Sequence, residues 1–146
     1  NSHLIITKEK QMPTEIEVWN LFWLATLANA AYFAGLAFLL WVSFRAANMA
    51  GESDNLLGKI VVSIFCLIIV FNINLNGAVA QWTGDGIAGV FVVMQSQGVE
   101  ISSGAQEVIS FSTEPGAAFS LMPDLLGGAF ILCILFMQMF NIWMKK

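Results

Sequence analysis

Three asparagines in the stretch FNINLNGAVAQW are the main polar groups of an otherwise apolar region. Asn72, Asn74 and Asn76 follow IVVSIFCLIIV, a run apolar enough to enter a bilayer. A buried amide without a hydrogen-bond partner costs roughly 2–7 kcal/mol, so each amide needs a partner from the same chain, from a second chain or from water. On a helix Asn72 and Asn76 share a face, whereas Asn74 lies about 200° from Asn72. The spacing therefore predicts polar neighbours on two sides of one helix.

The other residues that could do chemistry are few and scattered. Glu15 and Glu17 are two residues apart, so on a helix they face different ways, which favours a solvated helix start over a carboxylate pair. His3 is the only histidine, and Cys66 and Cys133 lie in separate apolar runs. Zinc, copper and haem sites usually need more such ligands than one chain offers here. The sequence predicts no catalytic, cofactor or metal site, and a protein that is not an enzyme.

The composition is that of an integral membrane protein. The chain has 146 residues, which suggests a single domain. Hydrophobic residues make up 58% and charged residues 11%, and the mean hydropathy is +0.75. A soluble domain carries about 25% charged residues, so this chain could not cover its surface in water. The net charge of −4, without a basic cluster, argues against a nucleic-acid site.

Three apolar runs are long enough to cross a bilayer, which takes about 20 residues. They cover residues 18–44, 60–82 and 125–144 and contain no Asp, Glu, Lys or Arg. A polar tail, 1–17, precedes the first run, and its Thr14 and Glu17 predict a capping box at the helix start. Proton relays and ion-coupled transporters usually place an ionisable group within the membrane, so the uncharged runs argue against a pump.

Residues 86–122 allow more than one interpretation. The preceding Thr83-Gly84-Asp85-Gly86 predicts a break in the second helix. A helical period then gathers on one face the residues Ile87, Val90, Phe91, Met94, Ile101, Ala105 and Val108. This pattern predicts an amphipathic or re-entrant segment, although VEIS and ISFS alternate as strands do. A fourth span at 86–99 would be short. The expected fold is an all-α integral membrane protein with three transmembrane helices plus this segment, four helices in all.

The distribution of basic residues predicts the topology. Three spans place the tail 1–17 and the loop 83–124 on one side, and the polar hairpin 46–58 and the C-terminus on the other. The second side carries Arg45, Lys59, Lys145 and Lys146, whereas the first carries Lys8 and Lys10. The positive-inside rule then places the C-terminus in the cytoplasm, and a four-span arrangement leads to the same placement.

Small and amide residues within the runs are the candidates for helix–helix contact. The small residues are Ala30, Ala31, Ala34, Gly35, Gly127 and Gly128. Small residues let helix backbones approach each other in a membrane, and amides such as Asn72, Asn76 and Gln138 can bridge helices at about 0.6–2 kcal/mol each. The contacts could lie within this chain or between copies. The expected partners are further copies or other membrane subunits, together with phospholipid.

Three stretches carry a resemblance to a known class of protein: LANAAYFAGLAFLLW, the QWTGDG segment, and LLGGAFILCILF with its terminal KK. In these the chain resembles small multi-span membrane subunits of conjugation and type IV secretion systems, including TraQ/DotE-like subunits and conjugative pilins. The resemblance implies a bacterial inner-membrane location, or an extracellular one in a pilus. It also implies a non-enzymatic subunit that oligomerises in a secretion or conjugation channel or pilus. The alternatives are an accessory membrane subunit of an oxidoreductase complex and a holin-like pore former.

Overall fold

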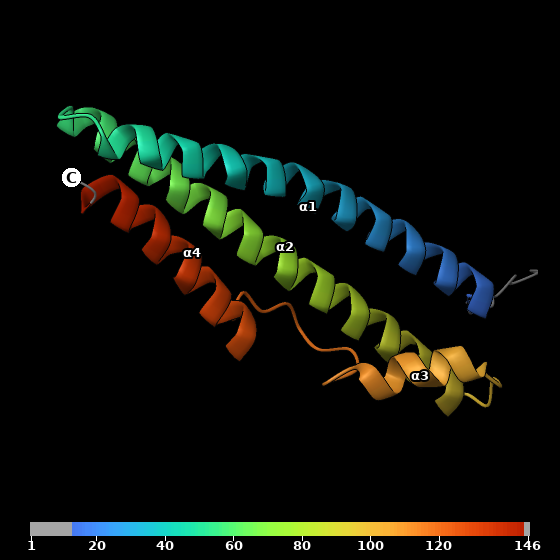
Figure 1. The fold of residues 1–146 in the computed structure, drawn as a ribbon. Coiled ribbons are helices and arrows are strands. Elements are labelled where there is room, and N and C mark those ends of the chain that lie inside the picture. The colour runs from blue at the N-terminus through green and yellow to red at the C-terminus, as the bar shows by residue number, and fades with distance from the viewer. Residues whose placement is uncertain (1–12, 145–146) are drawn as a thin grey trace, which may run out of the picture.

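The computed structural model describes residues 13–144, which form four helices (Figure 1). They are α1 (Glu15–Gly51), α2 (Leu56–Ser96), α3 (Ser103–Phe111) and α4 (Leu125–Trp143). By length and composition α1, α2 and α4 could each cross a membrane. The prediction of an all-helical fold with three candidate spans and a fourth helix is confirmed. The strand interpretation of VEIS and ISFS is wrong, because the described part of the chain contains no strand.

The two longest helices form an antiparallel hairpin that is the frame of the molecule (Figure 1). At 1.5 Å per residue, α1 and α2 are about 55 and 60 Å long, so both exceed the predicted runs 18–44 and 60–82. The predicted capping box is present: the Glu17 amide donates to the Thr14 hydroxyl, and the Thr14 amide donates to the Glu17 carboxylate at 2.7 Å. The polar hairpin predicted at 46–58 is shorter in the structure, where only residues 52–55 lie between α1 and α2. Asn55 caps α2, its side chain accepting a hydrogen bond from the Gly58 amide.

The predicted break at 83–86 is wrong, since α2 continues through it to Ser96. Each helical glycine costs about 1 kcal/mol relative to alanine, but tertiary contact outweighs this propensity. A Cβ atom on Gly89 would lie 2.7 Å from the Gly116 Cα, so the loop after α3 approaches the helix backbone directly. The Gly116 amide also donates to the Asp85 carbonyl at 2.6 Å. The glycine-rich stretch is therefore part of a helix against which the loop after α3 packs, and it does not form a turn.

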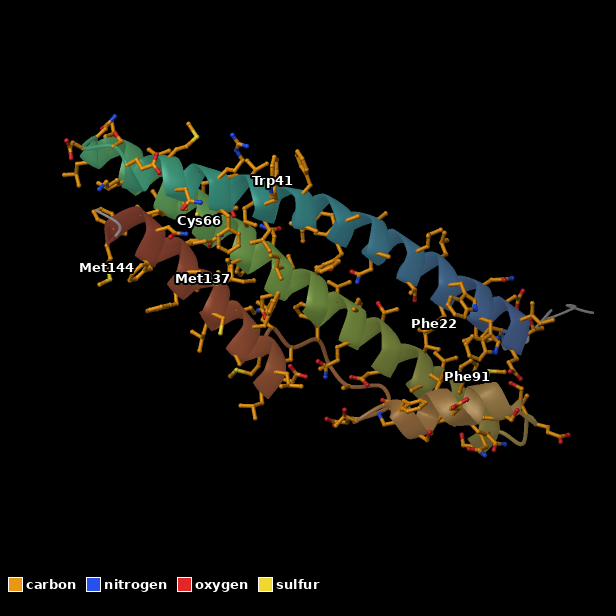
Figure 2. The ribbon with its side chains drawn as sticks, in the orientation of Figure 1. Phe22, Trp41, Cys66, Phe91, Met137 and Met144 are labelled. Atoms are coloured by element: carbon orange, nitrogen blue, oxygen red, sulfur yellow. The ribbon has the colours of Figure 1, made fainter. Side chains whose placement is uncertain are left out.

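The two shorter helices cover opposite ends of the hairpin (Figures 1 and 2). α4 packs against α1 and α2 near residues 52–55, whereas α3 packs against the far end of α2. The buried core has three clusters, centred on Ala47, Ala50, Cys66 and Ile142 at the hairpin end, on Leu36, Ile69 and Ile73 in the middle, and on Val18, Phe91, Met94, Ile101 and Ala105 at the α3 end. The amphipathic face predicted over 86–108 supplies most of the last cluster.

Candidate functional site

Asn72 and Asn76 lie on the side of α2 that faces α1. Asn76 is buried, and its Nδ2 atom donates to Asn29 Oδ1 at 2.6 Å and to the Asn29 carbonyl at 3.3 Å. Asn72 Oδ1 accepts from the Tyr32 hydroxyl at 2.9 Å, while its Nδ2 donates to the Ile68 carbonyl. The predicted stripe is thus a helix–helix contact within the chain, one turn of α2 long.

Asn74 faces the other way and meets a different element. Its Nδ2 atom donates to the Leu121 carbonyl at 2.9 Å. Leu121 belongs to the loop 112–124 between α3 and α4. The polar neighbours predicted on two sides of α2 are therefore both present, and α1 and the loop of the same chain supply them.

Gln138 lies in a fully buried polar contact between α4 and α1. Its Nε2 atom donates to the Ser43 hydroxyl at 2.7 Å, and that hydroxyl donates in turn to the Leu40 carbonyl. Cys66 of α2 packs at the same level, its thiol 3.8 Å from the Ser43 carbonyl. Gln138 Oε1 is a buried acceptor without a partner among the described residues. The contact joins all three candidate spans at one depth.

The small residues of α1 are exposed in the described part of the chain. They are Ala30, Ala31, Ala34 and Gly35, and two of them, Ala31 and Gly35, line a hollow between α1 and α2 together with Ile68, Ile69 and Asn72. A Cβ atom on Gly35 would meet no atom within 4 Å. The close approach that small residues permit is therefore unused within the described part of the chain.

Gly127 and Gly128 act at the start of α4 and do not contact another helix. Asp124 caps this helix, its Oδ1 accepting from the Gly127 amide at 2.6 Å. A Cβ atom on Gly127 would lie 2.8 Å from that Oδ1, and one on Gly128 would lie 3.7 Å from Pro123 Cγ. The glycines make room for the Pro123–Asp124 cap.

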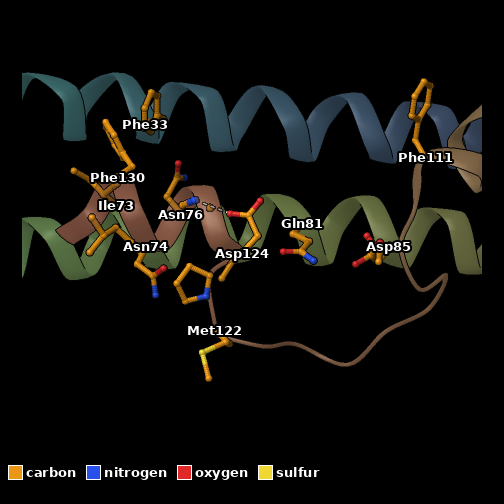
Figure 3. A pocket seen from close by; sticks show the side chains of 16 residues that line it. Phe33, Ile73, Asn74, Asn76, Gln81, Asp85, Phe111, Met122, Asp124 and Phe130 are labelled. Atoms are coloured by element: carbon orange, nitrogen blue, oxygen red, sulfur yellow. Dashed lines mark hydrogen bonds between the residues drawn. The ribbon is translucent and has the colours of Figure 1, made fainter. Parts of the chain in front are cut away.

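A groove of about 640 Å³ lies where α1, α2, the loop 112–124 and the start of α4 meet (Figure 3). One end is lined by the apolar side chains of Phe33, Ile73 and Phe130, and the other reaches Asp85 and Phe111. Pockets of about 300–1,000 Å³ with a few polar groups commonly hold small molecules. This groove is therefore a candidate binding site.

Asp85 is the one acidic residue that is buried in the described part of the chain, at 7% exposure. Its Oδ1 accepts from the Ser112 hydroxyl at 2.6 Å, and its carbonyl accepts from the Gly116 amide. The side chain lines the groove one helical turn from Gln81. Asp85 thus holds the loop against α2 and places an acidic group at the groove wall.

Residues 13–144 contain no group of three His, Cys, Asp or Glu side chains that could hold a metal ion.

Glu15 and Glu17, which are predicted to form a solvated helix start, bind different partners. Glu15 reaches across to α3 and accepts from both the amide and the hydroxyl of Ser102, whereas Glu17 serves the capping box. His3 lies outside the described residues.

Several site residues are not evident from the sequence. Tyr32, Ser43 and Asp85 each complete a contact, yet their spacing gives no signal, because each partner lies at least 27 residues away. The acidic side chain of Asp85 at the end of an apolar run is a signal of a polar contact, but the glycines on either side of it indicate a turn.

Comparison of the chain with protein-family models, with curated proteins and with solved structures found no match.

Proposed function

We propose that this protein is a non-enzymatic membrane subunit that works by assembling with further copies of itself through the exposed small residues of α1. The observation that carries the proposal is the exposed patch of Ala30, Ala31, Ala34 and Gly35. The resemblance to conjugation and type IV secretion subunits suggests the kind of assembly, a channel or pilus with its base in a bacterial inner membrane.

The tryptophans support a placement of the bilayer on the structure. Trp23 and Trp41 of α1 are 18 residues apart, which is about 27 Å along the helix. Trp143 donates to the Ser63 hydroxyl, and Trp82 lies 19 residues beyond Ser63, about 28 Å. Tryptophans gather at the two interfaces of a hydrocarbon core about 30 Å thick. The bilayer then extends from Trp41 and Trp143 to Trp23 and Trp82.

This placement assigns the two ends of the molecule to two aqueous sides. Arg45, over the ring of Trp41 at 5.6 Å, and Lys59 flank the first boundary, on the side of residues 52–55. The second boundary leaves α3, the last turns of α2 and most of the acidic residues in the other compartment. The positive-inside rule makes the first side, with the C-terminus, cytoplasmic.

The small-residue patch lies midway between the two tryptophan levels on α1. Larger exposed side chains flank it on the side of Ala30 and Ala34, Leu27 before it and Phe38 after it. The face is therefore recessed at the centre of the bilayer, where the backbone of a second helix could cross closely. Apolar burial gives helices no net attraction in lipid, so close packing of this kind is what associates them.

Disulfide crosslinking in membranes tests the proposal and has a native control. Cys66 is buried, and Cys133 is exposed on α4. In a Cys66→Ala, Cys133→Ser background, Ala34→Cys should crosslink most of the protein into dimers under mild oxidation. In a Cys66→Ala background the native Cys133 should give little crosslink, because it lies on another face.

Native mass spectrometry of the purified protein supplies the independent measurement. An oligomer that Ala34→Leu dissociates supports assembly through α1, since Ala34 is exposed and does not line the hollow between α1 and α2. A stable monomer, or crosslinking through Cys133 as efficient as through Ala34→Cys, would overturn it.

A further inference from the structure

The groove beside α2 changes in polarity along its length. It follows α2 from Ile73 to Asp85, which is about 18 Å at 1.5 Å per residue. Phe33, Phe130 and Ile131 line the first end together with Ile73. Asn76, Asp124 and Gln81 follow along the groove, and Asp85 lies at the other end, which Phe111 also lines (Figure 3). A single elongated molecule in it would meet an apolar wall at one end and the Asp85 carboxylate at the other.

The direction of this gradient agrees with the bilayer placement proposed above. Asp85 lies three residues beyond Trp82, on the aqueous side, whereas Ile73 lies nine residues before it, within the hydrocarbon region. The groove also runs along α2 and so crosses the boundary lengthwise. Its polar end faces water and its apolar end faces lipid, which is the orientation of an amphiphile in a membrane.

The charge of the groove selects the head group. Asp85 and Asp124 both line it. The cations among the described residues are Arg45 and Lys59, on either side of the turn at residues 52–55, at the opposite end of the molecule from α3 (Figure 1). An anionic head beside Asp85 would therefore meet like charge with no compensating cation among the described residues, whereas a primary ammonium could donate charge-assisted hydrogen bonds to the Asp85 carboxylate and to the side-chain oxygens of Gln81 and Thr113.

We infer that the groove binds a single-chain amphiphile with a primary ammonium head, the head beside Asp85 and the chain between Phe33 and Phe130. The volume of about 640 Å³ lies in the range that holds one drug-sized molecule. This inference uses the bilayer placement but does not require that the chain assembles.

Dodecylammonium is the probe, added at submicellar concentration to the full chain in a nonionic detergent. It should raise the thermal unfolding midpoint and appear as one bound molecule per chain by native mass spectrometry. Dodecyl sulfate and dodecanol, with the same chain, should do neither. An equal effect from dodecanol would overturn the inference, because the head group would then contribute nothing.

Two pairs of variants locate the site. Asp85→Asn retains an acceptor for Ser112 but removes the charge, and should weaken binding about tenfold or more; Asp54→Asn, in the exposed turn, should not. Gly77→Leu fills the groove from a position where a Cβ atom meets nothing within 4 Å, whereas Gly84→Leu is equally unhindered but does not line the groove. Binding unaffected by Asp85→Asn and by Gly77→Leu would overturn the assignment.

A lipid arm distinguishes the source of the ammonium group. Phosphatidylethanolamine that binds with the same dependence on Asp85 would overturn the single-chain assignment, because a two-chain membrane lipid would then be the occupant. Binding of dodecylammonium without phosphatidylethanolamine supports the inference and identifies a single-chain amine. Equal binding of phosphatidylglycerol and of dodecylammonium would contradict it. Crosslinking through α1 is measured separately, so failure of either proposal can be recognised by itself.

Discussion

The two ends of the α1–α2 hairpin use different chemistry to hold a third helix. At the α4 end three of the four buried core residues are small, Ala47, Ala50 and Cys66, and the helices are joined by a buried hydrogen bond between Ser43 and Gln138. At the α3 end the core contains the large residues Phe91 and Met94, and the polar contact between Glu15 and Ser102 lies on the surface. Small residues and interhelical hydrogen bonds are what packing in lipid requires, whereas large apolar side chains are what packing in water rewards.

The largest expected effect comes from truncating one core residue at each end. Met94→Ala should lower the free energy of unfolding by about 2–5 kcal/mol, because the lost burial and the cavity both count in water. Ile142→Ala should cost about 1–2 kcal/mol, because the side chain exchanges protein for lipid and only the packing is lost. Reversible unfolding in mixed micelles of dodecyl maltoside and dodecyl sulfate measures both. Equal losses would mean that the two ends share one environment.

The next largest change in stability is expected at the contact between α2 and the loop 112–124. Gly89→Ala places a methyl group 2.7 Å from the Gly116 Cα, so the loop must move and its bond to the Asp85 carbonyl is lost. We expect a loss of about 1–3 kcal/mol and faster amide exchange at Gly116. Gly84→Ala, where nothing lies within 4 Å, should instead stabilise the helix by up to about 1 kcal/mol. Slow exchange at Gly116 in Gly89→Ala would show that the contact is not tight.

The hydrogen bond between Asn29 of α1 and Asn76 of α2 lies within the proposed bilayer, so its strength can be measured there. A double-mutant cycle of Asn29→Ala and Asn76→Ala should give a coupling of about 0.6–2 kcal/mol, the range for hydrogen bonds between membrane helices. Asn20→Ala, at an exposed site on α1, is the matched change and should not couple to Asn76→Ala. A coupling of zero for Asn29 with Asn76 would contradict the contact.

The smallest effect concerns the surface bond that holds α3. Glu15 lies eight residues before Trp23, outside the proposed bilayer. The Ser102 hydroxyl, the Trp19 indole and the Ser102 amide together lower the pKa of its carboxyl below the ordinary 4.5. A lowered folded-state pKa means that the stabilisation is complete above about pH 4.5 and is lost as the pH falls through the folded value. The protection factors of the amides of residues 102–106, which correct for the intrinsic pH dependence of exchange, should therefore fall as the pH is lowered below 4.5.

Glu15→Gln provides the comparison for that titration. The amide cannot lose a charge on acidification, so exchange at residues 102–106 should be faster than in the wild type at pH 7 and should change less at low pH. Glu17→Gln, on the capping box, should leave α3 unaffected. An unchanged acid response in Glu15→Gln would assign the effect to another group.

Sequence patterns predicted the helical fold class, the three apolar spans and the buried face through Phe91, Met94 and Ala105, because hydrophobic periodicity reports burial directly. They also predicted that Asn72 and Asn74 would meet different neighbours. They misplaced the end of α2, since glycine at 84 and 86 signals a turn unless a distant loop packs on the helix. The groove could not be predicted, because its walls come from α1, α2, α4 and the loop 112–124, and no local pattern brings Phe33 to Phe130.

The asparagines also have a mechanical consequence. α2 is uninterrupted for about 60 Å, and hydrogen bonds on two opposite sides, Asn76 to α1 and Asn74 to the loop, prevent it from turning about its axis or sliding by a residue. What remains is tilting of α2 together with α1, because the two helices pack against each other at both ends, through Cys66 and Ala47 and through Phe91 and Val18. Because α4 braces only the end near residues 52–55, a tilt of about 5° there would displace the α3 end by about 5 Å over the full length. α2 therefore crosses the proposed membrane boundary as one rigid helix, and a small tilt at the α4 end becomes a larger displacement at the α3 end.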